Sequence, residues 1–427
     1  MKKSAHNVIA GFRPIIARFS PVIAGFSPVI ASAAKQSRIA TLCFIIAAIS
    51  TANAHPYIDK IYEYKPAPGQ FTNDLPKYDS GNTAEDMCRK AEALIANNQK
   101  LMISLGGYGG YVVFGFDHLV ENVAGKYDFK ISGNAFVSGT GADGRPKGSS
   151  EPGIVMVSYD ANGNNIPDDE WYEIAGSEYY KPETIHNYEI TYYKPDENKI
   201  RTPDSSYPYL NDTTYIRWTT NGYGEGYLSR NVYHNQPYYP QWLQDETLTF
   251  KGTKLADNYI DQSGTGSYYV QYAYDWGYAD NYTNSDSRSN INIDWAVDSA
   301  GNPVSLQGIH FVKVYTGVNQ YCGWIGETST EISGAEDLHL TGGDIDIPVS
   351  SEINTKTHTA LALLQNPVRE QIIITSPIDQ TATVYSITGN RIMQLKLKNG
   401  INHINCPLYR GVYIVVTDGK TLKFVKQ

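Results

Sequence analysis

The sequence predicts an all-β protein whose main part is a jelly-roll-like antiparallel β-sandwich. Apolar and polar residues alternate from Leu101 onward, in about ten short segments separated by glycine-containing turns. No helical pattern lies between these segments, which favours antiparallel pairing over crossover helices. The chain contains 34 tyrosines against 12 phenylalanines, and tyrosine suits strands of half-exposed sheets. We expect most tyrosines to pack on sheets, with a ligand platform as the alternative.

One helix is expected before the strands, over residues 83–99. Thr83 is a suitable N-cap residue, and acidic residues occupy the first turn that follows it. The apolar stripe of this helix is expected to consist of Met87, Ala91, Leu94 and Ile95. The strands are then expected, in order, within residues 102–122, 126–136, 153–160, 171–180, 188–195, 215–221, 247–255, 267–281, 291–298 and 308–317.

The N-terminal residues 1–54 predict a secretory signal peptide with an extension that export does not need. An apolar run over 39–52 follows Lys35 and Arg38 and precedes Ala52-Asn53-Ala54, an A-x-A cleavage site. The run is too short to span a bilayer. Cleavage would leave Cys88, Cys322 and Cys406, for which a Cys88–Cys322 bridge and isolated buried thiols are both open.

Charge and pattern divide the remaining chain. Residues 55–360 carry 21 Lys and Arg against 41 Asp and Glu, whereas residues 361–427 carry eight against three. The acidic block argues against nucleic acid and anionic membrane as partners, because both require a basic face. The expected division is a segment with the helix over 55–98, the β-sandwich body over 99–340, a linker over 341–360 and a small β-sandwich over 361–427.

Four ordered blocks mark the C-terminal module, namely residues 366–368, 384–389, 400–402 and 411–415. With these blocks the module resembles the type A sorting domain of the type IX secretion system of Bacteroidetes. The residues that carry this sorting signal are expected to include Asn366, Pro367, Gly389, Gly411 and Tyr413. The resemblance implies passage across the outer membrane by the type IX machinery, followed by attachment to surface lipopolysaccharide or release. An ordinary accessory β-sandwich is the alternative.

Short blocks of the body carry a second resemblance, over residues 107–110, 115–118, 133–136, 151–153, 171–173, 277–281, 294–298 and 311–314. They are similar to a family of Bacteroidetes cell surface proteins. The resemblance implies a surface-exposed, carbohydrate-module-like jelly roll without an enzymatic role. Some members accompany surface uptake systems, including systems for cobalamin.

The strongest candidate for a chemical site is the loop over residues 160–170. Ca²⁺ prefers six to eight oxygen ligands on a flexible loop, with alternate side chains pointing inward and one backbone carbonyl near position 7. The expected ligands are Asp160, Asn162, Asn164, the carbonyl of Ile166, Asp168 and Asp169. Asn165 stands where such loops usually have glycine, and Glu170 or Glu173 would replace the missing acidic residue at position 12. A hairpin turn without metal is the alternative.

A loop that contacts a ligand, which we call the ligand lip, is predicted in the proline-interrupted segment 233–242. Proline excludes this segment from a central strand, so its clustered aromatic rings are expected in an exposed loop. The residues expected to contact the ligand are Tyr238, Tyr239, Trp242 and, from a later segment, Trp276. Sheet packing is the alternative for each of these rings, as it is for Trp218 and the other aromatic candidates.

These observations predict a secreted protein on the outer cell surface that binds a glycan or a cobalamin-like ligand and does not catalyse a reaction. The sequence contains no HExxH motif and no GxSxG motif. A carbohydrate-active hydrolase and an adhesin or structural surface protein remain the alternatives. A carboxylate pair facing one cleft would favour the hydrolase, and a flat surface would favour the adhesin.

Overall fold

The computed structural model describes residues 54–141, 144–343, 345–347, 361–363, 368, 371–387, 389–398, 400–417 and 420–426. The predicted signal peptide therefore lies outside the described residues, apart from Ala54. The chain forms two compact units. The first comprises the described residues up to Asn122 together with Asp128–Thr341, and the second comprises those of Val123–Tyr127 and Gly342–Gln427.

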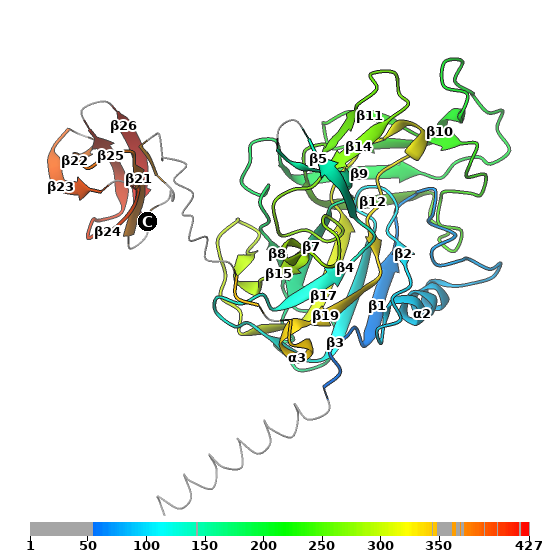
Figure 1. Ribbon diagram of the computed structural model, residues 1–427, viewed down its shortest axis with the longest axis horizontal. Helices are drawn as coiled ribbons and strands as arrows, with labels where there is room; N and C mark the ends of the chain where they lie inside the picture. Colours follow the sequence, from blue (N-terminus) through cyan, green and yellow to red (C-terminus); the bar gives the residue numbers. More distant parts are fainter. Residues whose placement is uncertain are drawn as a thin grey trace, which may run out of the picture. The chain divides into compact units, whose positions relative to one another are not determined.

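A six-stranded antiparallel sheet forms the centre of the first unit (Figure 1). Its two longest strands, over residues 111–121 and 308–316, are mostly apolar, and most of their side chains are buried. The strand order is β1 (Lys60–Lys65), β3 (Tyr111–Glu121), β17 (Gly308–Thr316), β7 (Gly153–Ser158), β8 (Trp171–Ile174) and β16 (Ala296–Val297).

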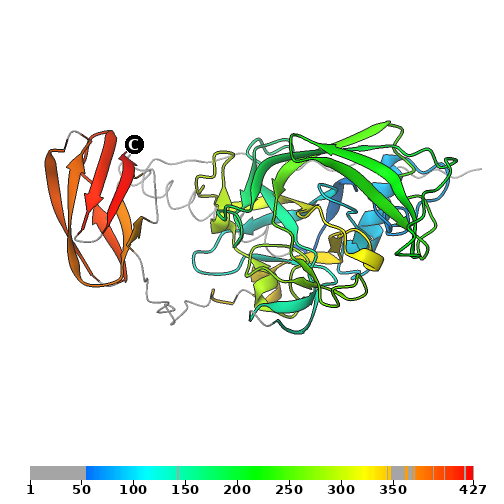
Figure 2. The same cartoon turned by 90° about the horizontal axis from the view of Figure 1, so that it is seen from above.

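A second, four-stranded antiparallel sheet packs against the first, and Figure 2 shows its long strands in green. Its order is β11 (Glu225–Asn231), β10 (Leu210–Thr220), β9 (Ile185–Tyr193) and β12 (Thr247–Lys254). The backbone N–H of Thr253 donates to the Tyr315 hydroxyl at 2.8 Å, and the Phe250 ring packs edge-on against Tyr111. Aromatic side chains therefore join the two sheets, and their hydroxyls reach backbone partners across the core.

Smaller sheets and turns complete the first unit. One sheet consists of β13 (Tyr259–Asp261), β14 (Tyr269–Tyr272), β6 (Pro146–Ser149) and β5 (Phe136–Thr140). Another consists of β15 (Asn290–Ile291), β4 (Phe129–Ser132) and β19 (Gly334–Asp337), and β2 (Ile103–Ser104) pairs with β18 (Glu331–Ile332). The short helices are η1 (Ser287–Ser289), η2 (Ile293–Trp295), η3 (Gly323–Ile325) and α3 (Leu338–Thr341).

The predicted helix is α2 (Ala84–Ile95), which lies against β1 (Figure 1). Thr83 and Asp86 form a reciprocal capping box at its start, as the sequence pattern indicates. The helix ends four residues before the predicted end, because Asn97 and Asn98 adopt left-handed backbone angles of +50° and +61°. Its apolar stripe is buried, except that Leu94 is only partly buried.

The second unit is a small β-sandwich, as predicted. One sheet has the order β20 (Ala362–Leu363), β21 (Gln371–Ser376) and β24 (Gly400–Asn405), and the other has β23 (Arg391–Leu397), β22 (Gln380–Ser386), β25 (Gly411–Val416) and β26 (Thr421–Lys426). Alternate residues of these strands, such as Ile372, Val384 and Phe424, share one buried core.

The predicted all-β class is confirmed by this arrangement of antiparallel sheets. Sequence reasoning missed β1, although its residues Lys60–Lys65 alternate in burial, and it missed several short strands. Cys88, Cys322 and Cys406 are free thiols, so the structure contains no Cys88–Cys322 bridge. Within the described residues, no helix has the length and apolar character needed to cross a membrane.

Candidate functional site

The predicted calcium loop lies between β7 and β8 and is organised around Asp160. One oxygen of its carboxylate accepts the N–H groups of Gly163 and Asn164, at 2.8 and 3.1 Å, and the other accepts the N–H of Asn165 at 2.9 Å. Burial opposes ionisation of Asp160, but these N–H groups outweigh it and lower its pKa. Asn165 adopts the left-handed conformation expected of it, with φ of +57°.

Side chains at alternate positions of the loop meet at Asp168. The amide groups of Asn162 and Asn164 donate to the Asp168 carboxylate at 3.1–3.2 Å. Asp169 accepts the backbone N–H of Ala161 at 3.1 Å. Positions 1, 3, 5, 9 and 10 are therefore held in one closed loop by hydrogen bonds among themselves, and calcium binding by this loop stays a prediction.

The residues expected to complete the calcium shell are engaged elsewhere. Glu170 accepts the Tyr172 hydroxyl at 2.9 Å, and Glu173 accepts the Thr253 hydroxyl at 2.7 Å. The carbonyl of Ile166 accepts a backbone N–H within the loop. The loop residues fit a calcium ion in donor type and spacing, with no acidic residue of the loop at position 12.

The predicted ligand lip at Tyr238, Tyr239 and Trp242 is wrong. These side chains are only 1%, 1% and 6% exposed, and they pack in the two main hydrophobic cores. The Trp242 ring stacks near Tyr64 and Tyr78 at centroid distances of 6.0 and 6.1 Å. Rings enclosed in this way cannot stack on a ligand.

The reason for this error is a long-range contact. The carbonyls of Pro237 and Tyr239 accept the side-chain amide of Asn73 at 2.7 and 3.0 Å, and the carbonyl of Tyr238 accepts the N–H of Gly69. The prolines do interrupt the strand, but the segment 69–73 supplies the donors that allow the interrupted backbone to be buried. Trp276 is half-buried and packs on Trp295 at 4.4 Å, so its predicted contact with a ligand stays a prediction.

A different set of aromatic rings lines an open cavity of about 100 Å³, which we call the aromatic pocket. Its principal walls are Tyr108, Tyr192, Trp218, Tyr227, Tyr321 and Glu327. Three polar atoms of these residues are buried without a hydrogen-bond partner, namely the hydroxyls of Tyr108 and Tyr321 and the Oε2 atom of Glu327. Buried polar groups are normally paired, but each of these atoms has less than 1 Å² of accessible surface, so an external partner would reach them only after the pocket walls move.

Glu327 is the acidic residue of the aromatic pocket. Its Oε1 atom accepts the N–H of Gln70 at 2.6 Å, while Oε2 lacks a partner. Burial raises the pKa of Glu327 to about 7, although the Gln70 hydrogen bond opposes this shift. Near neutral pH the carboxyl group therefore either donates or accepts a hydrogen bond with little change in free energy.

Sequence reasoning had included Trp218 among the aromatic candidates but missed Tyr108, Tyr321 and Glu327. Tyr108 lies in the glycine-rich turn before β3, and Glu327 follows η3, so no local periodicity connects them. Their convergence depends on contacts between distant segments.

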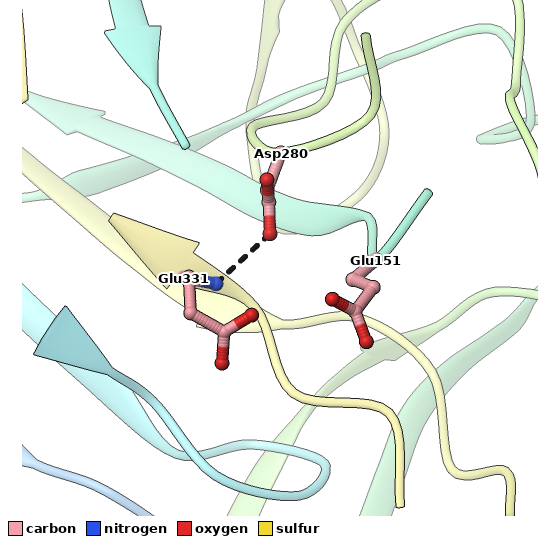
Figure 3. Close-up of side chains that lie close together, drawn as sticks. All are labelled: Glu151, Asp280 and Glu331. Carbon is pink, nitrogen blue, oxygen red and sulfur yellow. Dashed lines mark hydrogen bonds between the residues drawn. The ribbon is translucent and has the colours of Figure 1, made fainter. Parts of the chain in front are cut away.

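A group of three acidic residues, Glu151, Asp280 and Glu331, was also missed. Among the described residues, these are the ones whose carboxylate oxygens gather within 4.8 Å of one another, and all three are buried. Figure 3 shows the three side chains pointing toward one another. Nothing in their sequence spacing connects residues 151, 280 and 331.

The residues expected to direct sorting lie partly in the described region. Asn366 and Pro367 lie outside it. Gly389 occupies the turn between β22 and β23 with φ of +85°, a conformation that favours glycine. Gly411 begins β25, and the Tyr413 ring stacks on Phe424 at 5.5 Å. Gly389 and Tyr413 thus have clear structural roles, and their role in sorting stays a prediction.

The chain matches no model of a known protein family and no curated protein.

Proposed function

We propose that this chain is an exported, surface-displayed protein that binds a small polyhydroxylated group, such as the terminal sugar of a glycan, in the aromatic pocket without catalysing a reaction. The observation that carries this proposal is the cavity lined by aromatic rings, beside which three polar atoms lack a partner, two on tyrosines and one on Glu327. An unpaired buried polar group costs about 1–3 kcal/mol, which a ligand with hydroxyl groups would recover.

The chemistry of the pocket suits a sugar. Ring faces stack on the apolar face of a sugar, and the two tyrosine hydroxyls and Glu327 exchange hydrogen bonds with its hydroxyl groups. A cavity of about 100 Å³ accommodates one small group and not a corrin ring. Tyr227 is 48% exposed, so the remainder of a longer ligand would pass over it at the rim.

The lining of the aromatic pocket does not fit a glycoside hydrolase. Glycoside hydrolysis requires two carboxylates that flank the scissile bond. Glu327 is the one carboxylate among the residues that line the described pocket. Its pKa near 7 would suit a general acid, but a lone acid without its partner binds a ligand and does not complete the reaction.

A separate groove of about 780 Å³ argues against a flat adhesive surface. It is lined by residues of α2 and β19 and by the segment that follows α2, including Leu94, Leu101, Met102 and Glu336. Glu336 forms an ion pair with Lys130 at 2.5 Å, which occupies this carboxylate with a structural contact. A hollowed surface favours ligand binding over adhesion through a broad face.

Export is supported by the signal-peptide pattern and by the basic C-terminal β-sandwich with its resemblance to a type IX sorting domain. On this proposal the first unit is the exported cargo and the second unit carries the sorting signal. The 160–170 loop would bind calcium at the cell surface and hold together the connection between β7 and β8.

The ligand proposal is tested by titrating the purified protein, without the signal peptide, with a panel of monosaccharides and short oligosaccharides while tryptophan fluorescence is recorded. We expect saturable quenching by at least one sugar. Trp218→Ala should weaken its binding tenfold or more, because ring stacking contributes on the order of 1 kcal/mol or more. Trp324→Ala is the matched control, since this ring is 46% exposed and lies outside the pocket lining.

Two results would contradict the proposal. One is the absence of saturable binding to any sugar of the panel. The other is equal weakening by Trp218→Ala and Trp324→Ala, which would place the ligand elsewhere. Cobalamin is included in the panel, and tight binding of cobalamin that is insensitive to Trp218→Ala would also exclude the pocket.

A further inference from the structure

Three segments that are distant in the sequence bring the acidic group together. Glu151 follows β6, Asp280 lies in the loop after β14, and Glu331 begins β18. They are 9%, 2% and 4% exposed, and their carboxylate oxygens lie within 4.8 Å of one another. The group therefore occupies the interior of the first unit.

Asp280 is held in place by backbone donors. Its Oδ1 atom accepts the N–H groups of Asn134 and Ala135, both at 2.8 Å, and its Oδ2 atom accepts the N–H of Glu331 at 2.9 Å (Figure 3). A Cβ atom at Gly133 would lie only 2.2 Å from Oδ1, so glycine there permits the close approach. Three N–H groups stabilise Asp280 as an anion.

The carboxylates of Glu151 and Glu331 have no comparable set of backbone N–H donors among the described residues. The Oε1 atom of Glu331 is buried without a hydrogen-bond partner, although the side chain points toward Glu151 and Asp280 (Figure 3). None of the three carboxylates forms an ion pair with a described Lys, Arg or His. Removing an unpaired ionised group from water is so costly that such a group takes up a proton or binds a cation.

We propose that Glu151, Asp280 and Glu331 hold a calcium ion in the interior of the first unit. This site is separate from the predicted loop site at Asp160 and independent of the proposed ligand.

The donor set selects a hard cation. All three ligands are carboxylates, and the nearby Ser104 and Ser329 hydroxyls, which hydrogen-bond Glu331, add further oxygens. No nitrogen or sulfur ligand belongs to the group, which disfavours zinc and copper. Ca²⁺ tolerates irregular oxygen coordination, whereas Mg²⁺ retains several waters, for which a buried site has little room.

A bound calcium ion would replace the protons that otherwise neutralise these three carboxyl groups. Without it, burial raises the pKa of all three carboxyl groups, and mutual repulsion adds to this for Glu151 and Glu331. With it, the carboxylates ionise and the ion joins the segments around residues 151, 280 and 331. The unpartnered Oε1 atom of Glu331 then gains a ligand.

The test separates this site from the surface loop. In the purified Asp160→Ala protein, which lacks the principal loop ligand, we expect one calcium per chain by elemental analysis after dialysis against millimolar calcium. Adding Glu331→Gln to this background should weaken calcium binding at least a hundredfold, measured by calorimetric titration. Glu178→Gln is the matched control, because Glu178 is also a buried glutamate but lies outside the group. It should leave calcium binding unchanged.

Three outcomes would overturn the proposal. One is the absence of bound calcium in the folded Asp160→Ala protein, which requires no substitution in the group itself and so is informative even if Glu331→Gln fails to fold. Another is unchanged calcium binding after Glu331→Gln. The third is stability of Asp160→Ala that responds to pH but not to calcium, which would show that the group holds protons only. Loss of sugar binding would affect the proposed function alone.

Discussion

Substitution of Glu327 by glutamine should make the protein more stable at alkaline pH. The carboxylate is 5% exposed and accepts one N–H, from Gln70, while its second oxygen has no partner. Ionising such a group in the folded state is costly. Glutamine retains the carbonyl that accepts from Gln70 and cannot ionise, so Glu327→Gln should remove this cost with little change in packing.

The magnitude follows from the pKa. Burial raises the pKa of Glu327 from 4.5 to about 7, so between these values the folded state binds the proton more tightly than the unfolded chain. Stability therefore falls as pH rises through this window. Below pH 4.5 both states are protonated and the contribution vanishes, whereas above pH 7 the full penalty of about 3 kcal/mol is present.

The assay is urea unfolding of the wild-type and Glu327→Gln proteins at pH 4, 6 and 9, followed by tyrosine and tryptophan fluorescence. We expect nearly equal free energies of unfolding at pH 4 and an advantage for Glu327→Gln that grows to about 3 kcal/mol at pH 9. Other buried acids contribute to both proteins, so the difference between the two curves isolates Glu327.

Parallel pH profiles for the two proteins would refute the reasoning, because they would mean that Glu327 ionises without penalty in the folded state. A variant less stable than the wild type at every pH would also refute it. That result would assign the carboxylate a net stabilising contact that outweighs its burial.

Three further predictions concern residues outside the aromatic pocket. Trp242→Ala should lower the free energy of unfolding by about 3–5 kcal/mol in urea denaturation, because the ring is buried in the core; a loss below 1 kcal/mol would contradict this placement. Thr83→Ala should cost about 1 kcal/mol by the same measurement, since it removes the cap of α2, whereas Thr283→Ala should change little, because the half-buried Thr283 does not cap a described helix. Deletion of residues 361–427 should retain the protein in the periplasm, as judged by fractionation and surface labelling; undiminished surface display would show that the second unit is not the sorting signal.

Local pattern was sufficient for the elements whose stability is local. The start of α2 follows from Thr83 and Asp86, which lie three residues apart and satisfy each other's backbone donors. The strand character of β3 and β17 follows from their mostly apolar sequences. The turns around Asp160 follow from side chains that reach N–H groups three to five residues ahead. For the cap and the turns the determining contacts lie within a few residues of one another, so the sequence alone determined them, whereas the pairing of β3 with β17, which joins Tyr111 to Tyr315, depends on the tertiary structure.

Only the tertiary structure decided which polar and aromatic groups are enclosed. Tyr238 and Trp242 are buried because the distant segment 69–73 covers the backbone around them, and the Oε2 atom of Glu327 lacks a partner because residues from several segments enclose it. Glu151, Asp280 and Glu331 meet although up to 180 positions separate them. Burial and the pKa of a carboxylate depend on every atom nearby, and neighbours in space are set by chain packing and not by sequence separation.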